Sequence, residues 1–309
     1  MITIPPSIFF SVPMFFTSEG DIDWDTLERY LEDCASSAGV EILYAMAYNT
    51  RYPQLTVEEI LAVNRRVCAA AHRHGKRAIV GHPITLTTVQ LRAFCETLAP
   101  LSPWAVSVLF PERYYGIAQP VMDYLSAPAT AGLSTFVHEM KLVSGFDGSL
   151  VDWPEALVRQ AMELPHVVGI KEDSKHDPLS SMVIREFADR RAVVLAGGGK
   201  RRALRFLPEG LTMWLNGSLM LCPAPAARVH AAFTGGDQPF IDRYLAEVEA
   251  PFFDQVVKRH GWHVGHRAAL QVAGYGGRYE RGPMSVMGDD DFEIARPILE
   301  NVVTALRGF

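Results

Sequence analysis

The stretch His166-Val-Val-Gly-Ile-Lys-Glu-Asp-Ser174 decides how the rest of the chain is interpreted. Its apolar run, residues 167–170, predicts a buried strand, and Lys171 stands at the C-terminal edge of that strand. A lysine is rarely buried unpaired, because removing an ammonium from water carries a large desolvation cost. A primary amine in a site where burial lowers its pKa is suited to Schiff-base chemistry with a ketone. The alternative is a strand that has simply ended and turned polar.

Bulk composition sets the class of protein. The chain has 309 residues, of which 49% are hydrophobic and 21% charged, as in ordinary globular proteins. This length accommodates one large barrel-type domain or two smaller domains. The net charge of −6 argues against nucleic acid or an acidic membrane as the main partner. Only six of the 29 basic residues (Lys and Arg) are lysines, and the other five lie in predicted helix ends or loops.

Cysteine usage and hydropathy give further expectations. Cys34, Cys68, Cys95 and Cys222 show no paired spacing, so we expect reduced core thiols rather than disulfides or a zinc site. The N-terminus has no basic region typical of a signal peptide, and no apolar run reaches the roughly 18 residues of a membrane-spanning helix. We therefore expect a soluble, cytoplasmic protein.

A repeated strand–helix pattern predicts the fold. Apolar segments with strand character recur at intervals of roughly 20 to 35 residues, at 8–14, 40–45, 77–80, 105–110, 134–138, 167–170, 192–196 and 211–215. Each is followed by a helical pattern, and a helix between two strands implies that the strands are parallel. Eight such units predict a closed (β/α)8 TIM barrel.

Local signals place several helix starts. Asp23 is a predicted N-cap, Thr56-Val-Glu-Glu59 is a predicted capping box, and Asp152-Trp-Pro-Glu155 combines an Asp cap with an early proline. No Gly-x-Gly-x-x-Gly motif follows the first strand, which disfavours a doubly wound nucleotide-binding fold. We expect a barrel over residues 1–225 and a helical C-terminal extension over 226–309, packed on the barrel as one structural unit.

The barrel gives Lys171 a place. Active sites of this fold lie at the C-terminal ends of the strands, and Lys171 ends the sixth strand. Side chains alternate along a strand, so if Gly169 and Lys171 both point inward, the amine projects into the barrel mouth. This position favours the catalytic interpretation of Lys171 over a strand that turns polar.

The pattern Val-Gly-Ile-Lys-Glu-Asp resembles the end of strand six in the dihydrodipicolinate synthase / N-acetylneuraminate lyase family of class I, Schiff-base aldolases. The resemblance extends to Phe16-Thr-x-x-Gly-x-Ile-Asp23, Leu55-Thr-x-Glu-Glu59, Leu195-Ala-Gly197 and the helical C-terminal extension. It implies that Lys171 forms a Schiff base with pyruvate or a related 2-keto acid, without metal or cofactor. It also implies a homo-oligomer, either a tetramer or a dimer.

The loop after strand two departs from the family. Family members usually carry Gly-Thr-Thr-Gly-Glu there, and the threonine pair holds the carboxylate of the keto acid. This chain reads Ala47-Tyr-Asn-Thr-Arg51, which places Tyr48 and Asn49 at the threonine positions. Arg51 takes the glutamate position, where it would either grip an extra carboxylate with both guanidinium arms or be an ordinary surface arginine.

A second departure concerns the proton relay. The family usually ends strand five with Tyr-Asn-x-Pro, and its tyrosine relays protons beside the imine. This chain reads Thr135-Phe-Val-His-Glu-Met140, so His138 takes the place of the tyrosine by register. A histidine can serve as general acid–base, or it can merely line the rim of the barrel. Tyr114 and Tyr115 resemble the family's tyrosine pair after strand four, with Tyr115 as a catalytic candidate, or are ordinary interface or core aromatics.

Small and basic residues follow the last two strands. Gly197, Gly198 and Asn216 would let a substrate approach backbone N–H groups, or they form tight turns without ligand contact. Lys200-Arg-Arg202 is either a solvated helix start or a source of positive field for an acidic substrate.

The sequence thus predicts a lyase, an aldolase or a dehydratase, that acts on a 2-keto acid through Lys171, with a 2-keto-3-deoxy sugar acid as one candidate. The altered positions disfavour typical dihydrodipicolinate synthase activity and weaken the case for neuraminate lyase. The alternative is a non-catalytic keto-acid-binding barrel that has lost its proton relay. A metal-dependent hydrolase is disfavoured, because residues 8–14 contain no histidine pair.

Overall fold

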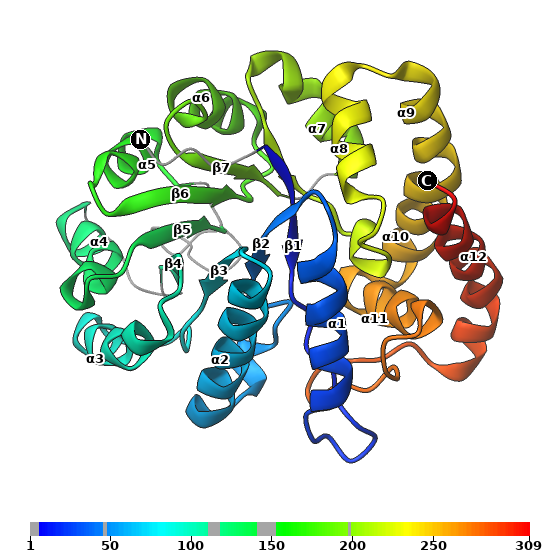
Figure 1. The fold of residues 1–309 in the computed structure, drawn as a ribbon, viewed down its shortest axis with the longest axis horizontal. Coiled ribbons are helices and arrows are strands. Elements are labelled where there is room, and N and C mark those ends of the chain that lie inside the picture. The colour runs from blue at the N-terminus through cyan, green and yellow to red at the C-terminus, as the bar shows by residue number, and fades with distance from the viewer. Residues whose placement is uncertain (1–5, 46–47, 111–117, 141–152, 197–198) are drawn as a thin grey trace.

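The computed structural model of the chain describes residues 6–45, 48–110, 118–140, 153–196 and 199–309. Eight parallel strands form a closed barrel in chain order, and helices surround them (Figure 1). The strands are β1 Ser7–Ser11, β2 Val40–Tyr44, β3 Arg77–Val80, β4 Ala105–Leu109, β5 Thr135–Glu139, β6 Val167–Glu172, β7 Ala192–Leu195 and β8 Met213–Leu215. The predicted (β/α)8 barrel is confirmed.

The strand ends differ from the predicted ranges in informative places. β6 continues to Glu172, so Lys171 lies within the strand rather than at its edge. β1 ends at Ser11, three residues before its apolar run ends, and the next residues bond the end of β2 and the loop after it: Val12 N donates to Tyr44 O, and Met14 N donates to Asn49 O. Apolar sequence thus extends beyond the strand itself.

Helices around the barrel begin largely where the capping signals predict. They are α1 Trp24–Ser36, α2 Val57–Arg73, α3 Thr88–Leu98, α4 Ala118–Leu125, α5 Glu155–Glu163, α6 Asp177–Phe187, α7 Gly199–Phe206 and α8 Ala226–Gly235. Asp23 accepts from Thr26 N at 3.0 Å, and the capping box between Thr56 and Glu59 is present. The predicted start of α5 is wrong in detail: Pro154 occupies the N-cap position without a side-chain cap, and Asp152 lies outside the described residues.

Aromatic and small side chains fill the barrel interior. The rings of Phe9 and Tyr44 both pack on Phe136, with centroid distances of 6.0 and 5.6 Å. Gly169 lies opposite Phe136 in the register of β5 and β6. A Cβ atom added at Gly169 would stand only 2.7 Å from Ala192 Cβ and 2.9 Å from Phe136 Cε2. Glycine is therefore required here for close packing of the layer beneath Lys171.

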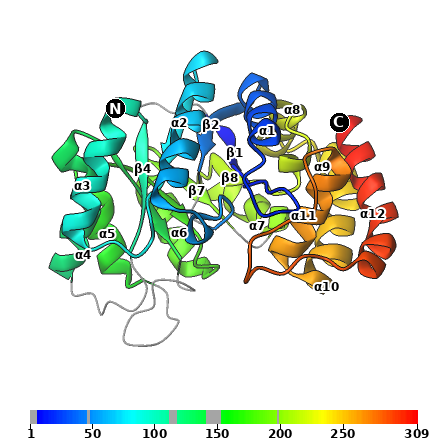
Figure 2. The same cartoon turned by 90° about the horizontal axis from the view of Figure 1, so that it is seen from below.

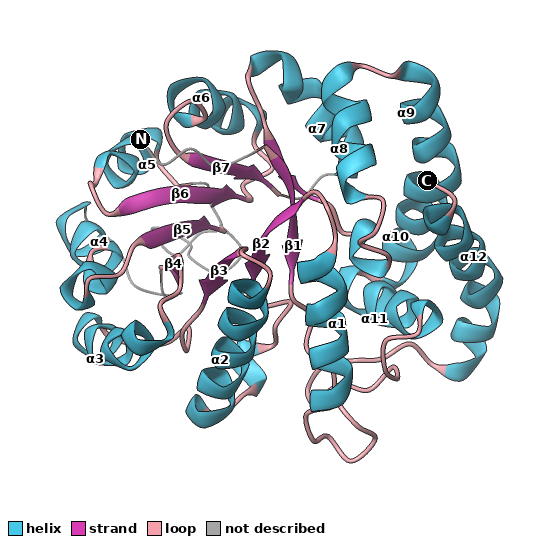
Figure 3. Cartoon of the chain, in the orientation of Figure 1, coloured by secondary structure: helices cyan, strands magenta, loops and turns pink. Residues whose placement is uncertain are grey.

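The C-terminal helices lie together on one side of the barrel (Figures 1 and 2). After α8, which packs against β1, the chain is continuously helical from α9 to α10 through two π-helical segments. These elements are α9 Gln238–Tyr244, the π segments Leu245–Glu249 and Pro251–Val257, α10 Lys258–His260, α11 Trp262–Ala273 and α12 Asp289–Arg307 (Figure 3). Among the described residues, no helix combines the length and apolarity needed to span a bilayer.

A buried ionic cluster joins these helices to the barrel loops. Arg51, in the loop after β2, donates to both carboxylate oxygens of Glu280 at 2.9 and 2.6 Å. Arg267 of α11 donates to the same carboxylate at 3.1 Å and also to the Met14 carbonyl. Burial opposes ionisation of Glu280, but the two guanidinium groups hold its pKa below the usual value. One buried carboxylate thus pairs with two buried arginines.

Replacement of Glu280 by glutamine tests this anchor. The change leaves Arg51 and Arg267 buried without a counter-charge, so we expect the free energy of unfolding to fall by about 3–5 kcal/mol. Urea denaturation followed by circular dichroism measures the loss. The control is Glu163→Gln, because Glu163 pairs with Arg190 at the surface and exposed pairs contribute about 0–1 kcal/mol. Equal losses in the two variants would contradict the anchoring role.

Gly169→Ala tests the packing beneath the lysine. The added methyl group collides with Ala192 and Phe136, and overpacking of this kind costs about 1–3 kcal/mol. The matched control is Gly235→Ala near the end of α8, where an added Cβ meets no atom within 4 Å. We expect that control to be neutral or slightly stabilising in the same urea titration. An unchanged Gly169→Ala midpoint would show that the barrel layer has spare room.

Candidate active site

A row of register-matched side chains crosses the C-terminal end of the barrel. Leu109 of β4 is paired with His138 of β5, His138 with Lys171 of β6, and Lys171 with Val194 of β7. The residue two positions before Lys171 is the interior Gly169, so alternation along β6 directs Lys171 to the same side. The barrel itself therefore places an imidazole beside an amine.

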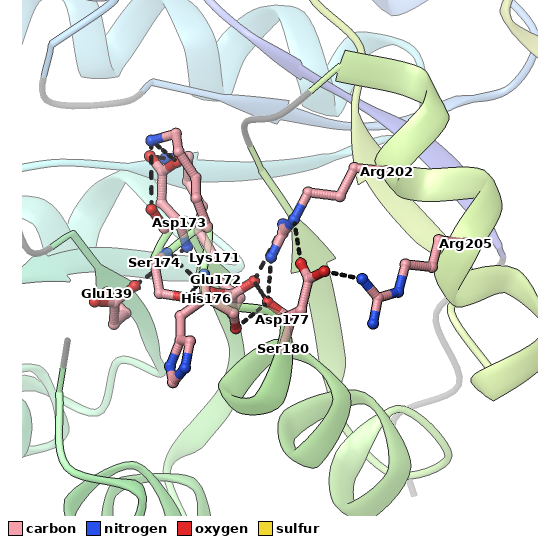
Figure 4. Close-up of polar contacts among 11 residues, drawn as sticks. Glu139, Lys171, Glu172, Asp173, Ser174, His176, Asp177, Ser180, Arg202 and Arg205 are labelled. Atoms are coloured by element: carbon pink, nitrogen blue, oxygen red, sulfur yellow. Dashed lines mark hydrogen bonds and ion pairs between the residues drawn. The ribbon is translucent and has the colours of Figure 1, made fainter.

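The amine of Lys171 has two polar neighbours. Nζ donates to Asp173 Oδ2 at 2.5 Å and lies 2.8 Å from His138 Nε2. The lysine is 1% exposed, and the His138 side chain is fully buried. Figure 4 shows Lys171 and Asp173 together at the end of β6. Lys171 thus stands in a low-dielectric site with a carboxylate and an imidazole as partners.

The protonation states follow from these surroundings. Burial, and next the charge of Lys171, lowers the pKa of His138 to about 4, so its ring is neutral at neutral pH. An ammonium only donates, so Nε2 accepts from Nζ and the ring carries its hydrogen on Nδ1. Burial opposes ionisation of Asp173, but Lys171 and His138 hold the pKa of that carboxyl well below its usual range. The site therefore contains an ion pair and a neutral base.

Asp173 is the site residue that the sequence prediction missed. The alternation that directs Gly169 and Lys171 inward continues to residue 173, so the signal was present in the sequence. The Asp173 backbone N–H donates to Glu139 Oε2 at 3.3 Å, and Lys175 Nζ contacts Oδ1 at 3.2 Å. These contacts fix the carboxylate with Oδ2 directed at the amine.

Glu172, the neighbouring carboxylate, points the other way. It accepts from Ser174 N at 2.8 Å and from Ser180 Oγ at 2.6 Å, and Arg202 of α7 lies 3.7 Å away (Figure 4). Arg202 also donates to Asp177 at 3.1 Å, and its side chain is only 10% exposed. For Arg202, the interpretation as a solvated helix start is wrong, because this arginine ties α7 to the start of α6.

The loop after β2 is engaged by other parts of the chain. Asn49 is buried; its Nδ2 donates to Ser11 Oγ at 2.6 Å, and its Oδ1 accepts from Trp262 Nε1 at 3.1 Å. Tyr48 is half-buried and packs with Leu109 at the barrel mouth, together with Ile84 and Met140. The structure thus brings Tyr48, but not the amide of Asn49, to an apolar cluster next to His138 and Lys171.

Arg51 and Asn216 are also held by protein groups. Arg51 is 4% exposed and binds Glu280, so its interpretation as a surface arginine is wrong. The fully buried Asn216 accepts from Leu219 N at 3.1 Å and donates to Tyr244 Oη at 3.2 Å. Both side chains have polar partners supplied by the C-terminal part of the chain.

Four predicted site residues, Tyr114, Tyr115, Gly197 and Gly198, lie outside the described residues. Within the described part of the chain, no group of three or more His, Cys, Asp or Glu side chains is arranged to hold a metal ion. The described site therefore consists of Lys171, His138 and Asp173, with the apolar cluster around Leu109 beside them.

Comparison with known proteins finds solved structures with a similar fold. No protein-family model and no curated protein sequence matches the chain. A dihydrodipicolinate synthase from Bacillus clausii superposes with a TM-score of 0.79 at 17% identity, covering 95% of this chain and 96% of the other. The pyruvate complex of the chloride-inhibited dihydrodipicolinate synthase from Acinetobacter baumannii gives 0.80 at 18% identity, covering 97% and 99%.

A catalytic-lysine mutant of the sialic acid aldolase from Ruminococcus gnavus gives a TM-score of 0.81 at 15% identity. That alignment covers 98% of this chain and 97% of the other. The similarity thus spans the barrel and the C-terminal helices alike, at identities that establish the architecture. The chain has the fold of the dihydrodipicolinate synthases and the sialic acid aldolase.

Proposed function

We propose that the protein is a lyase that forms a Schiff base between Lys171 and a 2-keto acid. The observation that carries this proposal is the buried amine at the barrel mouth, held between a neutral imidazole and a carboxylate. A lysine in such a site is suited to nucleophilic catalysis on carbonyl compounds. The solved relatives add support, since one is described with bound pyruvate and another by its catalytic lysine.

The chemistry proceeds through the imine. The Lys171 ammonium gives one proton to His138 Nε2, and the neutral Nζ then attacks the ketone carbon. The carbonyl oxygen takes up that proton and a second one from Nζ and leaves as water, and the protonated imine that remains withdraws electrons from the neighbouring carbon. Loss of a proton or cleavage of a carbon–carbon bond then gives the enamine, and a carbon–oxygen bond can break from the enamine in a dehydration. His138 Nε2, which lies 2.8 Å from Nζ, is positioned to move the protons.

The described groups suggest how the substrate is held. The side-chain amide of Asn49 is occupied by Ser11 and Trp262, so we assign carboxylate binding to the backbone N–H groups of the loop after β2. Tyr48 and Leu109 offer an apolar surface to the remainder of the substrate. A 2-keto-3-deoxy sugar acid stays one candidate, and the choice between cleavage and dehydration belongs to experiment.

The alternative of a non-catalytic keto-acid-binding barrel rests on the missing tyrosine. His138 supplies a titratable group in contact with the amine, which favours the enzyme. The roles of Tyr114, Tyr115, Gly197 and Gly198, and assembly into a homo-oligomer, stay predictions.

Reductive trapping tests the Schiff base directly. With pyruvate and borohydride, we expect one carboxyethyl group on Lys171, seen by intact mass and located by peptide mapping. Lys171→Met should abolish the adduct, whereas Lys258→Met should retain it, because Lys258 is an exposed lysine on α10. Absence of an adduct with pyruvate and with a panel of longer 2-keto acids would refute the proposal.

Proton exchange tests His138 without knowledge of the full substrate. In D2O the wild type should exchange the methyl protons of pyruvate through the enamine, as followed by NMR. His138→Gln removes the base but leaves the amine, so exchange should slow by about 10²–10⁴-fold while trapping persists. Protonation of His138 should slow wild-type exchange as the pH falls toward about 4, the value to which burial lowers its pKa. Undiminished exchange in His138→Gln would assign the relay elsewhere.

A further inference from the structure

We propose that Asp173 is a catalytic residue: it is the counter-ion of the protonated imine on Lys171, and by retaining the imine N–H it releases His138 Nε2 for proton transfer to and from the substrate. This inference rests on the proposed Schiff-base function. It assigns different tasks to the two groups that contact Nζ in the free protein.

A count of hydrogens leads to this division. The ammonium of Lys171 carries three N–H bonds and serves two acceptors, Asp173 Oδ2 and His138 Nε2. Reaction with a ketone forms the C=N bond, and the carbonyl oxygen leaves as water with two of the three protons. The protonated imine keeps the positive charge but only one N–H. One of the two acceptors must therefore lose its donor.

The geometry indicates that the remaining imine N–H stays hydrogen-bonded to Asp173. Its Oδ2 is the closer acceptor, at 2.5 Å against 2.8 Å for His138 Nε2, and it carries a full negative charge. The side chain is 11% exposed, and charge–charge attraction strengthens as water is excluded. The imidazole is neutral and offers only a dipole. When the Nζ–H that faced His138 is lost, the lone pair of Nε2 becomes free and is directed at the substrate atoms bonded to Nζ.

The charged and titratable groups around this pair fit the assignment. From β5, His138 and Glu139 face it, and Lys175 contacts the other oxygen of Asp173. Tyr44 of β2 also interacts electrostatically with Asp173, but burial raises the pKa of its hydroxyl far above neutrality, so it stays uncharged. Lys175 and Glu139 have side chains of opposite charge, and both contact Asp173 rather than Nζ. Asp173 is the carboxylate in contact with Nζ.

The test is the pH dependence of imine protonation. Cyanoborohydride reduces the protonated imine selectively, so its rate of adduct formation with saturating pyruvate reports the protonated fraction. A counter-ion stabilises the protonated form and keeps that fraction high to more alkaline pH. Asp173→Asn keeps the shape and removes the charge, so we expect the alkaline midpoint to fall by about 1–3 pH units.

Glu172→Gln is the matched control, because Glu172 is a carboxylate one position away that is more deeply buried than Asp173 and whose contacts are Ser174, Ser180 and Arg202. Its midpoint should move by less than half as much. An Asp173→Asn midpoint equal to that of the wild type, or an equal shift in both variants, would overturn the counter-ion role. If Asp173→Asn does not fold, Asp173→Ser provides the same comparison.

A second readout separates this role from a structural one. Methyl proton exchange of bound pyruvate should decrease in Asp173→Asn at alkaline pH and recover as the pH is lowered, because acid restores the protonated imine. A loss that is the same at every pH would contradict the proposal. Failure of the proposed function is distinguishable, since the wild type would then form no adduct at any pH.

Discussion

A buried ammonium in contact with one carboxylate and one imidazole is the constraint on which the site depends. Two nearby side chains offset the cost of desolvating Lys171. Asp173 follows Lys171 by two positions, and His138 is the register partner of Lys171 on β5. Strand register in the closed barrel fixes His138 beside Lys171. Asp173 is the first residue after β6, and it is held by its contacts with Glu139 and Lys175.

The layer beneath the amine belongs to the same design. Gly169 lets Phe136 and Ala192 approach closely, and the rings of Phe9 and Tyr44 close the interior around Phe136. Lys171 therefore lies above a packed apolar layer, which excludes water from the side of the amine that faces it. That layer makes the interactions of Nζ with Asp173 and His138 stronger than the same contacts at a surface.

Sequence patterns predict the barrel and the place of Lys171 at its C-terminal end because these signals are local: hydrophobic periodicity, helix caps and the order of residues on a strand. His138 is predicted from the family resemblance, by its register with the family's tyrosine. Sequence patterns do not predict how Asn49 and Arg51 are used, because Trp262 and Glu280, their partners, lie more than 200 positions away in the chain. A loop position that looks free for ligand in the sequence is occupied by the C-terminal helices in the fold. Asp173 is a different case, since the alternation that placed Lys171 extends to it.

Two adjacent carboxylates, Glu172 and Asp173, point in opposite directions because side chains alternate along the strand. Glu172 and Asp173 are both held by several polar contacts, yet Glu172 faces the helices and binds serine hydroxyls near Arg202, while Asp173 faces the amine. Exchange of these environments would require a shift of one residue in β6, which would also move Gly169 away from its position opposite Phe136. The close packing at Gly169 thus holds the register that keeps Asp173, rather than Glu172, in contact with the amine of Lys171.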